Sequence, residues 1–297
     1  MLSRLAEASV WLGRYLERTE GLSRLLLEFH QLLIQDQRSH VARGCAILTH
    51  GLGLEMEAKT SRELISAVYG SSQNPSTILG ALHGIWSNAR SIRDTLPSDF
   101  FESINRLNAA ADDFVVSQPG SSLKDILDRL AVSNGIHEWL APSDESALFF
   151  RVGRSLERMD FVSRLLLMKI EAEWKDQGSA TTLRAVGGLS TFLKARVPIT
   201  ADRVRNFLIT DTTFPRSLIQ SSKSAEAAIR ELATTNDASS DLILRPIGLL
   251  SSQIYFLREN TEEEEEIVRK IPFAVEQTSE SIRQIFFRPM GSIVWSN

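Results

Sequence analysis

The sequence predicts an all-α protein: a large helical bundle built from two duplicated halves of about 140 residues with pseudo-two-fold symmetry. Three observations lead to this prediction. Apolar residues recur at helical spacing along almost the whole chain, and strand-like alternation flanked by hairpin turns is scarce. A string near the N-terminus, WLGRYLERTEGLSRLLL, returns in closely similar form as RVGRSLERMDFVSRLLL.

The first expected helix shows the periodicity on which the others also depend. Leu5, Leu12, Leu16, Ser23 and Leu27 fall on one stripe at steps of four and seven residues. Similar spacing predicts helices at about residues 2–37, 40–57, 60–69, 75–95, 98–117, 121–140, 143–177, 181–207, 215–235, 240–258 and 261–287. The nearest candidate for a strand is LILRPIG at 242–248, whose proline favours a break in a helix over a central strand.

The bulk composition is that of a globular protein with a substantial core. The chain has 297 residues, of which 43% are hydrophobic and 24% are charged. Its net charge of −4 argues against nucleic acid as a partner, and we find no apolar run long enough for a membrane span. The single cysteine and the charged N-terminal stretch, which is unlike a secretory signal, lead us to expect a cytoplasmic protein.

The internal repeat extends well beyond the first string. Ten of the fifteen residues at 13–27 are identical to those at 153–167, all at an offset of 140. The same register later places Pro75 on Pro215 and Arg90 on Arg230. We therefore expect one domain over 1–297, with repeats at 1–140 and 141–297 that face each other about a pseudo-two-fold axis.

A glycine inside each repeated string requires an explanation, because a glycine within a helix costs roughly 1 kcal/mol relative to alanine. Gly13 and Gly153 occupy matching places, which predicts that two long helices cross closely there. The charged residues beside the glycines form candidate crossed pairs: Glu17 with Arg158 or Arg154, and Glu157 with Arg18 or Arg14.

Two interpretations of these six charged residues remain open. The first is a structural ion-pair network, which we favour because the neighbouring arginines already satisfy the charge of each glutamate. The second is a site that holds an anionic ligand or a metal. A secondary anion site is also conceivable, because Arg90 and Arg93 lie one helical turn apart, and Arg216 and Ser217 would sit in the first turn of the helix that begins near residue 215.

The common motifs of metal and cofactor sites are missing from the sequence. The five histidines do not form the spacing of a helical zinc site, and there is no nucleophile elbow, Walker loop or dinucleotide-binding glycine motif. We therefore expect neither a metal nor a cofactor. The acidic run at 262–266 is interpreted as the start of a capped helix, with an acidic docking patch or a metal site as the alternative.

The sequence also resembles a known family. The opening MLSRLAEASVWLGRYLERTE, the internal NARSIRD and TFPRS, and the second GRSLERMD are similar, in this order, to motifs of the alpha-E family, an all-helical domain of unknown function. The resemblance spans nearly the whole chain. One departure is Trp11–Leu12, where an aromatic residue followed by Met or Ile is common.

The resemblance implies a setting but assigns no catalytic residue. Such proteins tend to be bacterial and to be encoded beside, or fused to, a circularly permuted ATP-grasp protein, often with a transglutaminase-like peptidase nearby. We therefore expect a non-catalytic helical partner or scaffold of an ATP-grasp peptide ligase, in a peptide-forming or peptide-tagging pathway. One alternative is an enzyme that uses Glu17, Glu157 and nearby arginines in acid–base chemistry on an anionic substrate. Another is a regulatory module that binds nucleotides or small anions. The sequence leaves the oligomeric state open.

Overall fold

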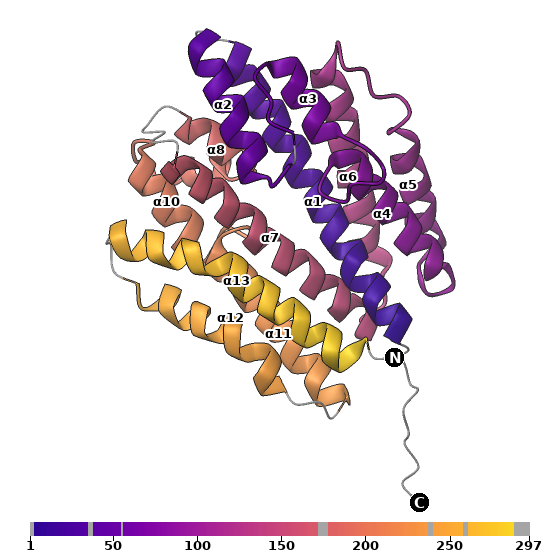
Figure 1. The fold of residues 1–297 in the computed structure, drawn as a ribbon. Coiled ribbons are helices and arrows are strands. Elements are labelled where there is room, and N and C mark those ends of the chain that lie inside the picture. The colour runs from indigo at the N-terminus through magenta and orange to yellow at the C-terminus, as the bar shows by residue number, and fades with distance from the viewer. Residues whose placement is uncertain are drawn as a thin grey trace, which may run out of the picture.

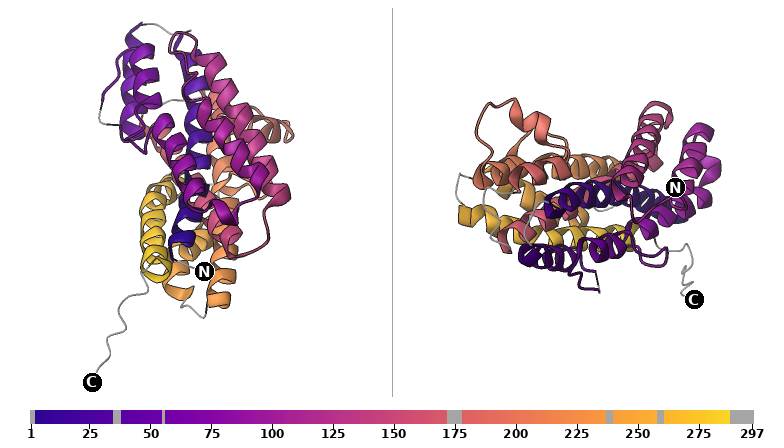
Figure 2. Two further views of the ribbon diagram at one scale, coloured as in Figure 1. Left: turned by 90° about the vertical axis from the view of Figure 1, so that its right-hand side faces the viewer. Right: turned by 90° about the horizontal axis from the view of Figure 1, so that it is seen from above.

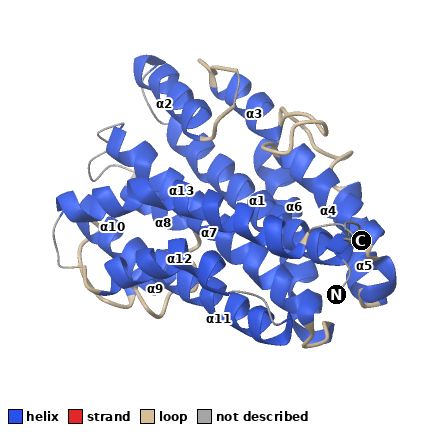
Figure 3. Cartoon of the chain, turned by 60° about the horizontal axis from the view of Figure 1, so that its bottom comes forward, coloured by secondary structure: helices blue, strands red, loops and turns tan. Residues whose placement is uncertain are grey.

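The computed structural model describes residues 3–34, 38–54, 56–171, 178–236, 240–257 and 261–287. Within these ranges the chain forms thirteen α-helices and one short 3-10 helix, and none of the described residues lies in a strand (Figure 3). The predicted all-α class is therefore confirmed. None of the described helices combines the length and apolar character that crossing a membrane requires.

The helices fall into two series along the chain. The first series contains α1 (Ser3–Ile34), α2 (Arg38–Gly51), α3 (Ser61–Tyr69), α4 (Ile78–Ser91), the 3-10 helix η1 (Arg93–Thr95), α5 (Ser98–Ala109) and α6 (Pro119–Leu140). The second contains α7 (Glu145–Glu171), α8 (Ser179–Ala185), α9 (Leu189–Leu193), α10 (Ala201–Thr210), α11 (Leu218–Asn236), α12 (Ser240–Tyr255) and α13 (Thr261–Phe286).

The long helices α1 and α7 run side by side through the middle of the molecule and make the most extensive contact between any two elements (Figure 1). Helices α4 and α6 pack against α1, and α5 packs against both of them. In the same way α11 and α13 pack against α7, and α12 packs against both. The magenta helices α4–α6 lie on one side of the central pair, and the orange α11 and α12 lie on the other (Figure 2).

A single hydrophobic core passes through both series. Leu16 and Phe29 of α1 are fully buried, as are Leu156 and Leu165 of α7. Burying a large apolar side chain contributes about 1.5–3 kcal/mol relative to leaving it exposed. The helices therefore form because each can bury its apolar stripe against a neighbour, and the central pair is covered from both sides.

The predicted helix at 181–207 is wrong, because three helices occupy that stretch. Helix α8 ends where Gly187 adopts a positive φ of 73°, and Arg196, with φ of 54°, follows the end of α9. Pro198 disfavours helical backbone in the residue before it, so the chain restarts only at α10. The predictions for residues 2, 35–37, 55, 172–177 and 258 lie outside the described residues.

Polar caps also move two predicted helix starts. The helix expected at 75–95 begins at Ile78, because the Thr77 hydroxyl accepts a hydrogen bond from the Gly80 N–H at 3.2 Å. The helix expected at 215–235 begins at Leu218, because the Ser217 hydroxyl accepts from the Gln220 N–H at 3.2 Å. Because Thr77 and Ser217 cap the two helices, Pro75 lies in the loop before α4 and Pro215 lies in the loop before α11.

Candidate functional site: a buried arginine–glutamate cluster

The central helices touch at two glycines. A Cβ atom built on Gly13 of α1 would collide with the carbonyl oxygen of Phe150 on α7 and lie 3.1 Å from the carbonyl carbon. A Cβ atom on Gly153 would collide with the carbonyl oxygen of Val10 and lie 2.9 Å from its carbonyl carbon. The two contacts are reciprocal, since 10 and 150, like 13 and 153, differ by 140. The close approach that the glycines predicted is confirmed.

Crossed ion pairs flank this contact. Glu157 accepts hydrogen bonds from Arg14 Nε at 2.8 Å, from Arg18 Nε at 2.5 Å and from Arg18 Nη2 at 2.9 Å. On the other side Glu17 accepts from Arg154 Nε at 3.4 Å. Arg158 Nε lies 2.8 Å from a Glu17 oxygen, in an ion pair that lacks hydrogen-bond geometry. Both carboxylates are 95% buried, and their ion pairs join α1 to α7.

A further arginine reaches the cluster from a distant part of the chain. Arg216, in the loop before α11, donates from Nε to Glu17 at 2.9 Å and lies 2.6 Å from Glu20 through Nη2. Sequence reasoning placed Arg216 in a secondary anion site instead. The structure thus connects Glu17 and Glu20 through one guanidinium, which makes Arg216 a member of the ion-pair cluster.

The other members of the secondary anion site lie apart from the cluster. Arg90 stacks over the Trp86 ring at 5.1 Å, and Arg93 stacks over the Phe101 ring at the same distance. Ser217 is buried and donates to the Asp211 carbonyl at 2.5 Å, in addition to capping α11. Arg90, Arg93, Arg216 and Ser217 therefore do not converge on a common anion site.

The arginines determine the ionisation of the buried acids. Burial by itself would raise the pKa of Glu17, but Arg216, Arg158 and Arg154 outweigh it and lower that pKa below its ordinary value. The pKa of Glu157 is lowered in the same way, with burial opposed by Arg18 and Arg14. Both groups are ionised at neutral pH. A general acid or base that works near pH 7 needs a pKa near the operating pH, so these carboxylates are poorly suited to that role.

The space around the cluster differs on its two sides. Beside Glu17 the cavity measures only about 10 Å³, less than a substrate needs. Beside Glu157 a cavity of about 270 Å³ opens between α1 and α7, with Ser76 on its wall. The space between Glu17 and Arg216 is therefore filled, whereas Glu157 borders accessible volume. Arg154 and Arg158, which pair with Glu17, also line a separate cavity of about 460 Å³.

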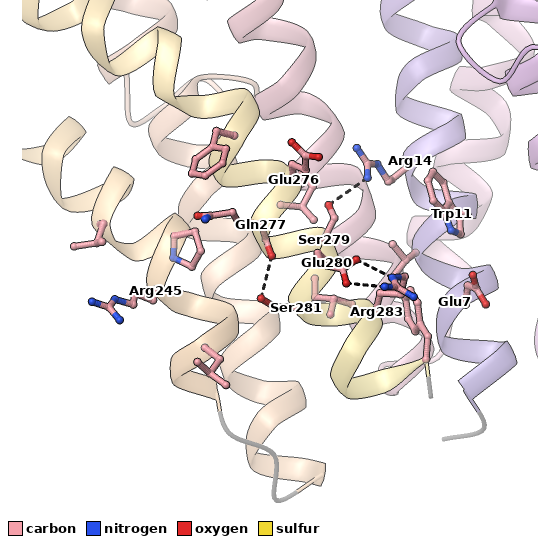
Figure 4. A pocket seen from close by; sticks show the side chains of 18 residues that line it. Glu7, Trp11, Arg14, Arg245, Glu276, Gln277, Ser279, Glu280, Ser281 and Arg283 are labelled. Atoms are coloured by element: carbon pink, nitrogen blue, oxygen red, sulfur yellow. Dashed lines mark hydrogen bonds and ion pairs between the residues drawn. The ribbon is translucent and has the colours of Figure 1, made fainter. Parts of the chain in front are cut away.

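One large groove formed by the described residues was not predicted from sequence. It is a groove of about 960 Å³ between α1, α12 and α13, which we call the α12–α13 groove (Figure 4). Its apolar rim exposes Leu242, Leu249 and Phe273, at 65%, 60% and 62% of their surface. Arg14 links the groove to the ion-pair cluster by donating to Ser279 Oγ at 3.3 Å (Figure 4). The seven-residue spacing of the two leucines was the available sequence signal, since it places both on one helical stripe.

No metal centre is formed by the described residues. Nowhere in the described ranges do three histidine, cysteine, aspartate or glutamate side chains gather in a way that could hold a metal ion. Two histidines have other contacts: His30 Nδ1 is hydrogen-bonded to Ser61 Oγ at 2.6 Å, and His137 stacks on Phe150. The acidic run at 262–266 begins α13, and Glu264 is buried there against Arg205 at 2.6 Å.

Comparison with known proteins agrees with these observations at the level of the family. Searches of curated proteins and of solved structures gave no significant match. A family model matches residues 1–287 and is described as a predicted alpha-helical domain with a conserved ER motif. Two Glu–Arg pairs, Glu17–Arg18 and Glu157–Arg158, lie at the centre of the fold. The match covers nearly the whole chain, which therefore belongs to the Alpha-E family.

Proposed function

We propose that this chain is a non-catalytic helical partner or scaffold of an ATP-grasp peptide ligase, in the cytoplasm of a bacterium and in a peptide-forming or peptide-tagging pathway. The family setting described above supports the pathway. A non-catalytic role is supported mainly by one observation: Glu17 and Glu157 are buried, ionised and paired with arginines. A transglutaminase-like peptidase is the second partner that this setting suggests.

The α12–α13 groove is the surface that we assign to the ligase. Large exposed apolar side chains grouped around one hollow are uncommon away from interaction sites. Leu242, Leu249 and Phe273 give the rim its apolar character, while Arg245 and Glu276 provide charges of both signs inside the groove. A polypeptide with apolar side chains and mixed charges would bury this rim.

The proposal is tested by mixing the purified chain and the ligase at micromolar concentration and measuring the mass of the complex by size-exclusion chromatography with light scattering. We expect a complex, and no turnover of ATP and peptide by the chain alone. Phe273→Asp should abolish the complex. Val132→Asp, at an exposed site on α6, should leave it intact. Failure to associate, or equal loss with both variants, would contradict the proposal.

The enzyme alternative is separated from this proposal by Glu17→Gln. If the residue is structural, the variant loses stability in proportion to any loss of function. Loss of an activity with an unchanged melting temperature would favour catalysis instead. The regulatory alternative is tested by a thermal-shift screen with nucleotides and acidic peptides, because a ligand that binds the native state raises the melting temperature.

We also propose that the chain is one domain that arose by duplication, with repeats at 1–140 and 141–297 about a pseudo-two-fold axis. Two sets of observations support this idea. The glycine contacts and the crossed ion pairs are reciprocal at an offset of 140. Helices α3 and α4 begin 140 residues before α10 and α11, and the packing of α4–α6 on α1 is matched by that of α11–α13 on α7. An experimental structure in which α1 and α4–α6 do not superpose on α7 and α11–α13 would contradict this idea.

A further inference from the structure

The cavity beside Glu157, which we call the Ser76 pocket, has a counterpart on the other side of the cluster. It measures about 270 Å³ and is lined by Leu22, Leu52, Ser76, Glu157, Asp160 and Phe161, among others. Arg18, Glu157 and Arg164 also line this pocket. The residues at the equivalent positions, 140 residues away, line the small cavity beside Glu17; they are Arg158, Glu17 and Arg24. The contacts on the two sides are independent of common ancestry and of the proposed ligase.

One of the differences between the two sides is the presence of a bridging arginine. Around Glu17, the guanidinium of Arg216 bridges the carboxylates of Glu17 and Glu20 and fills the space. The position equivalent to Arg216 is Ser76, which follows Pro75 just as Arg216 follows Pro215. A serine side chain is too short to reach the carboxylates, and a cavity of about 270 Å³ takes the place of one of about 10 Å³.

The carboxylates of the Ser76 pocket have capacity for another donor. Asp160, which corresponds to Glu20, accepts from Arg164 Nε through Oδ2 at 2.8 Å, and no described residue is hydrogen-bonded to its Oδ1. Glu157 receives two N–H groups on Oε2 and one on Oε1, whereas a carboxylate has about four acceptor sites. Each side of the cluster thus contains two carboxylates, but only the Glu17 side has the extra guanidinium.

The neighbouring arginines do not prevent a cation from entering. Around Glu17 and Glu20 the fold accommodates four arginines, namely Arg24, Arg154, Arg158 and Arg216. Around Glu157 and Asp160 there are three, namely Arg14, Arg18 and Arg164. Arg18 lines the pocket, and its guanidinium already has partners at both ends, because it donates to Glu157 and, through Nη1, to the Pro75 carbonyl at 2.9 Å. A fourth guanidinium would reproduce the charge balance of the other side.

We propose that the Ser76 pocket binds a guanidinium group carried on an alkyl arm, at the place equivalent to that of Arg216. The guanidinium donates to Asp160 Oδ1 and to Glu157 Oε1, the acceptors with free capacity. The Phe161 ring offers a wall on which a cation can stack, and Leu22 and Leu52 contact the arm. Its source is either a free guanidino compound or an arginine side chain of a bound peptide.

The probe that tests this proposal is L-argininamide, with L-citrullinamide as the uncharged isostere. Isothermal titration of the full chain should show saturable binding of L-argininamide that is at least tenfold tighter than that of L-citrullinamide. A second arm uses acetyl-Gly-Gly-Arg-Gly-Gly-amide. Tighter binding of the peptide than of L-argininamide identifies a peptide arginine as the source, and the reverse identifies a free compound.

Two variants locate the binding. Ser76→Arg supplies the missing guanidinium, so it should abolish binding of L-argininamide and preserve or raise the melting temperature. Ser72→Arg, in the same loop with an exposed side chain, should bind like the wild type. Asp160→Asn should weaken binding at least tenfold, and it decides the question if Ser76→Arg does not fold. Equal binding of the two amides, no saturable binding at millimolar concentration, undiminished binding by Ser76→Arg or by Asp160→Asn, or binding of inorganic phosphate in place of L-argininamide would overturn the proposal.

Discussion

Replacing Gly13 by alanine tests the close contact between α1 and α7 on which the fold depends. In an ordinary helix this substitution stabilises by about 1 kcal/mol, because alanine has the higher helix propensity. Here the added methyl group would overlap the carbonyl oxygen of Phe150 and approach Arg154 N to 3.2 Å. Both are backbone atoms of a packed helix, so neither can move aside by a change of rotamer.

The magnitude follows from these opposing effects. Forcing a methyl group into a packed interface costs typically 1–3 kcal/mol, and more where backbone must shift. Separating the helices here would also lengthen the ion pairs of Glu17 and Glu157, which span the same contact. We expect a net loss of about 1–3 kcal/mol after the propensity gain is included. Gly153→Ala should behave alike, since its methyl group meets the Val10 carbonyl.

Gly135→Ala is the matched control, because Gly135 also lies within a helix, α6, but has no atom within 4 Å of an added Cβ. It should stabilise by roughly 0.5–1 kcal/mol. Urea unfolding followed by circular dichroism should therefore separate the two alanine variants by about 1.5–4 kcal/mol. If Gly13→Ala proves as stable as Gly135→Ala, the helices do not touch through their backbones and the reasoning is refuted.

The remaining predictions concern buried groups. Glu17→Gln should cost about 3–5 kcal/mol in urea unfolding at pH 7, since it leaves arginines without their buried partner. Folding lowers the pKa of Glu17 from 4.5, so the stability that the ionised carboxylate contributes is present above pH 4.5 and is lost as the pH falls below it. The free energy of unfolding of the variant should therefore depend less on pH between pH 3 and 7 than that of the wild type. Burial, aided by Arg154, lowers the pKa of His137 to about 4, which NMR titration of the imidazole should reproduce; stability should fall as the pH drops from 6.5 towards 4, because only the unfolded state takes up that proton. Burial raises the pKa of the Cys45 thiol to about 11, so a disulfide reagent at pH 8 should react in urea but not with the native protein, and reaction of the native thiol would contradict its burial.

The central contact could be predicted from sequence because its signals are local and duplicated. Gly13 and Glu17 lie one helical turn apart, and the same pair recurs 140 residues later. The role of Arg216 could not be predicted in this way. It lies 199 residues from Glu17, and the helix start expected at residue 215 placed its side chain in the wrong setting. The loop geometry that directs this guanidinium depends on the capping by Ser217, which becomes evident only in three dimensions.

The α12–α13 groove illustrates a different limit. Leu242 and Leu249 fit an ordinary core stripe, and the sequence alone gives no reason to leave that stripe exposed. Their exposure follows from how α12 packs against α11 and α13, which buries the opposite residues Ile243 and Ile247. Periodicity identifies the faces of a helix but not which face finds a neighbour.

The buried charges explain how one alignment of α1 and α7 is selected. The leucines at 25–27 and 165–167 would pack acceptably in several registers, because apolar contacts are not directional. The crossed pairs are directional. Sliding α1 along α7 by one turn, about 5.4 Å, would separate Glu157 from Arg14 and leave a buried carboxylate without its partner. The same slide would bring a side chain against the Phe150 carbonyl in place of Gly13. The glycines and the Glu–Arg pairs therefore act together. The glycines permit the close approach of α1 and α7, and the Glu–Arg pairs restrict that approach to one register.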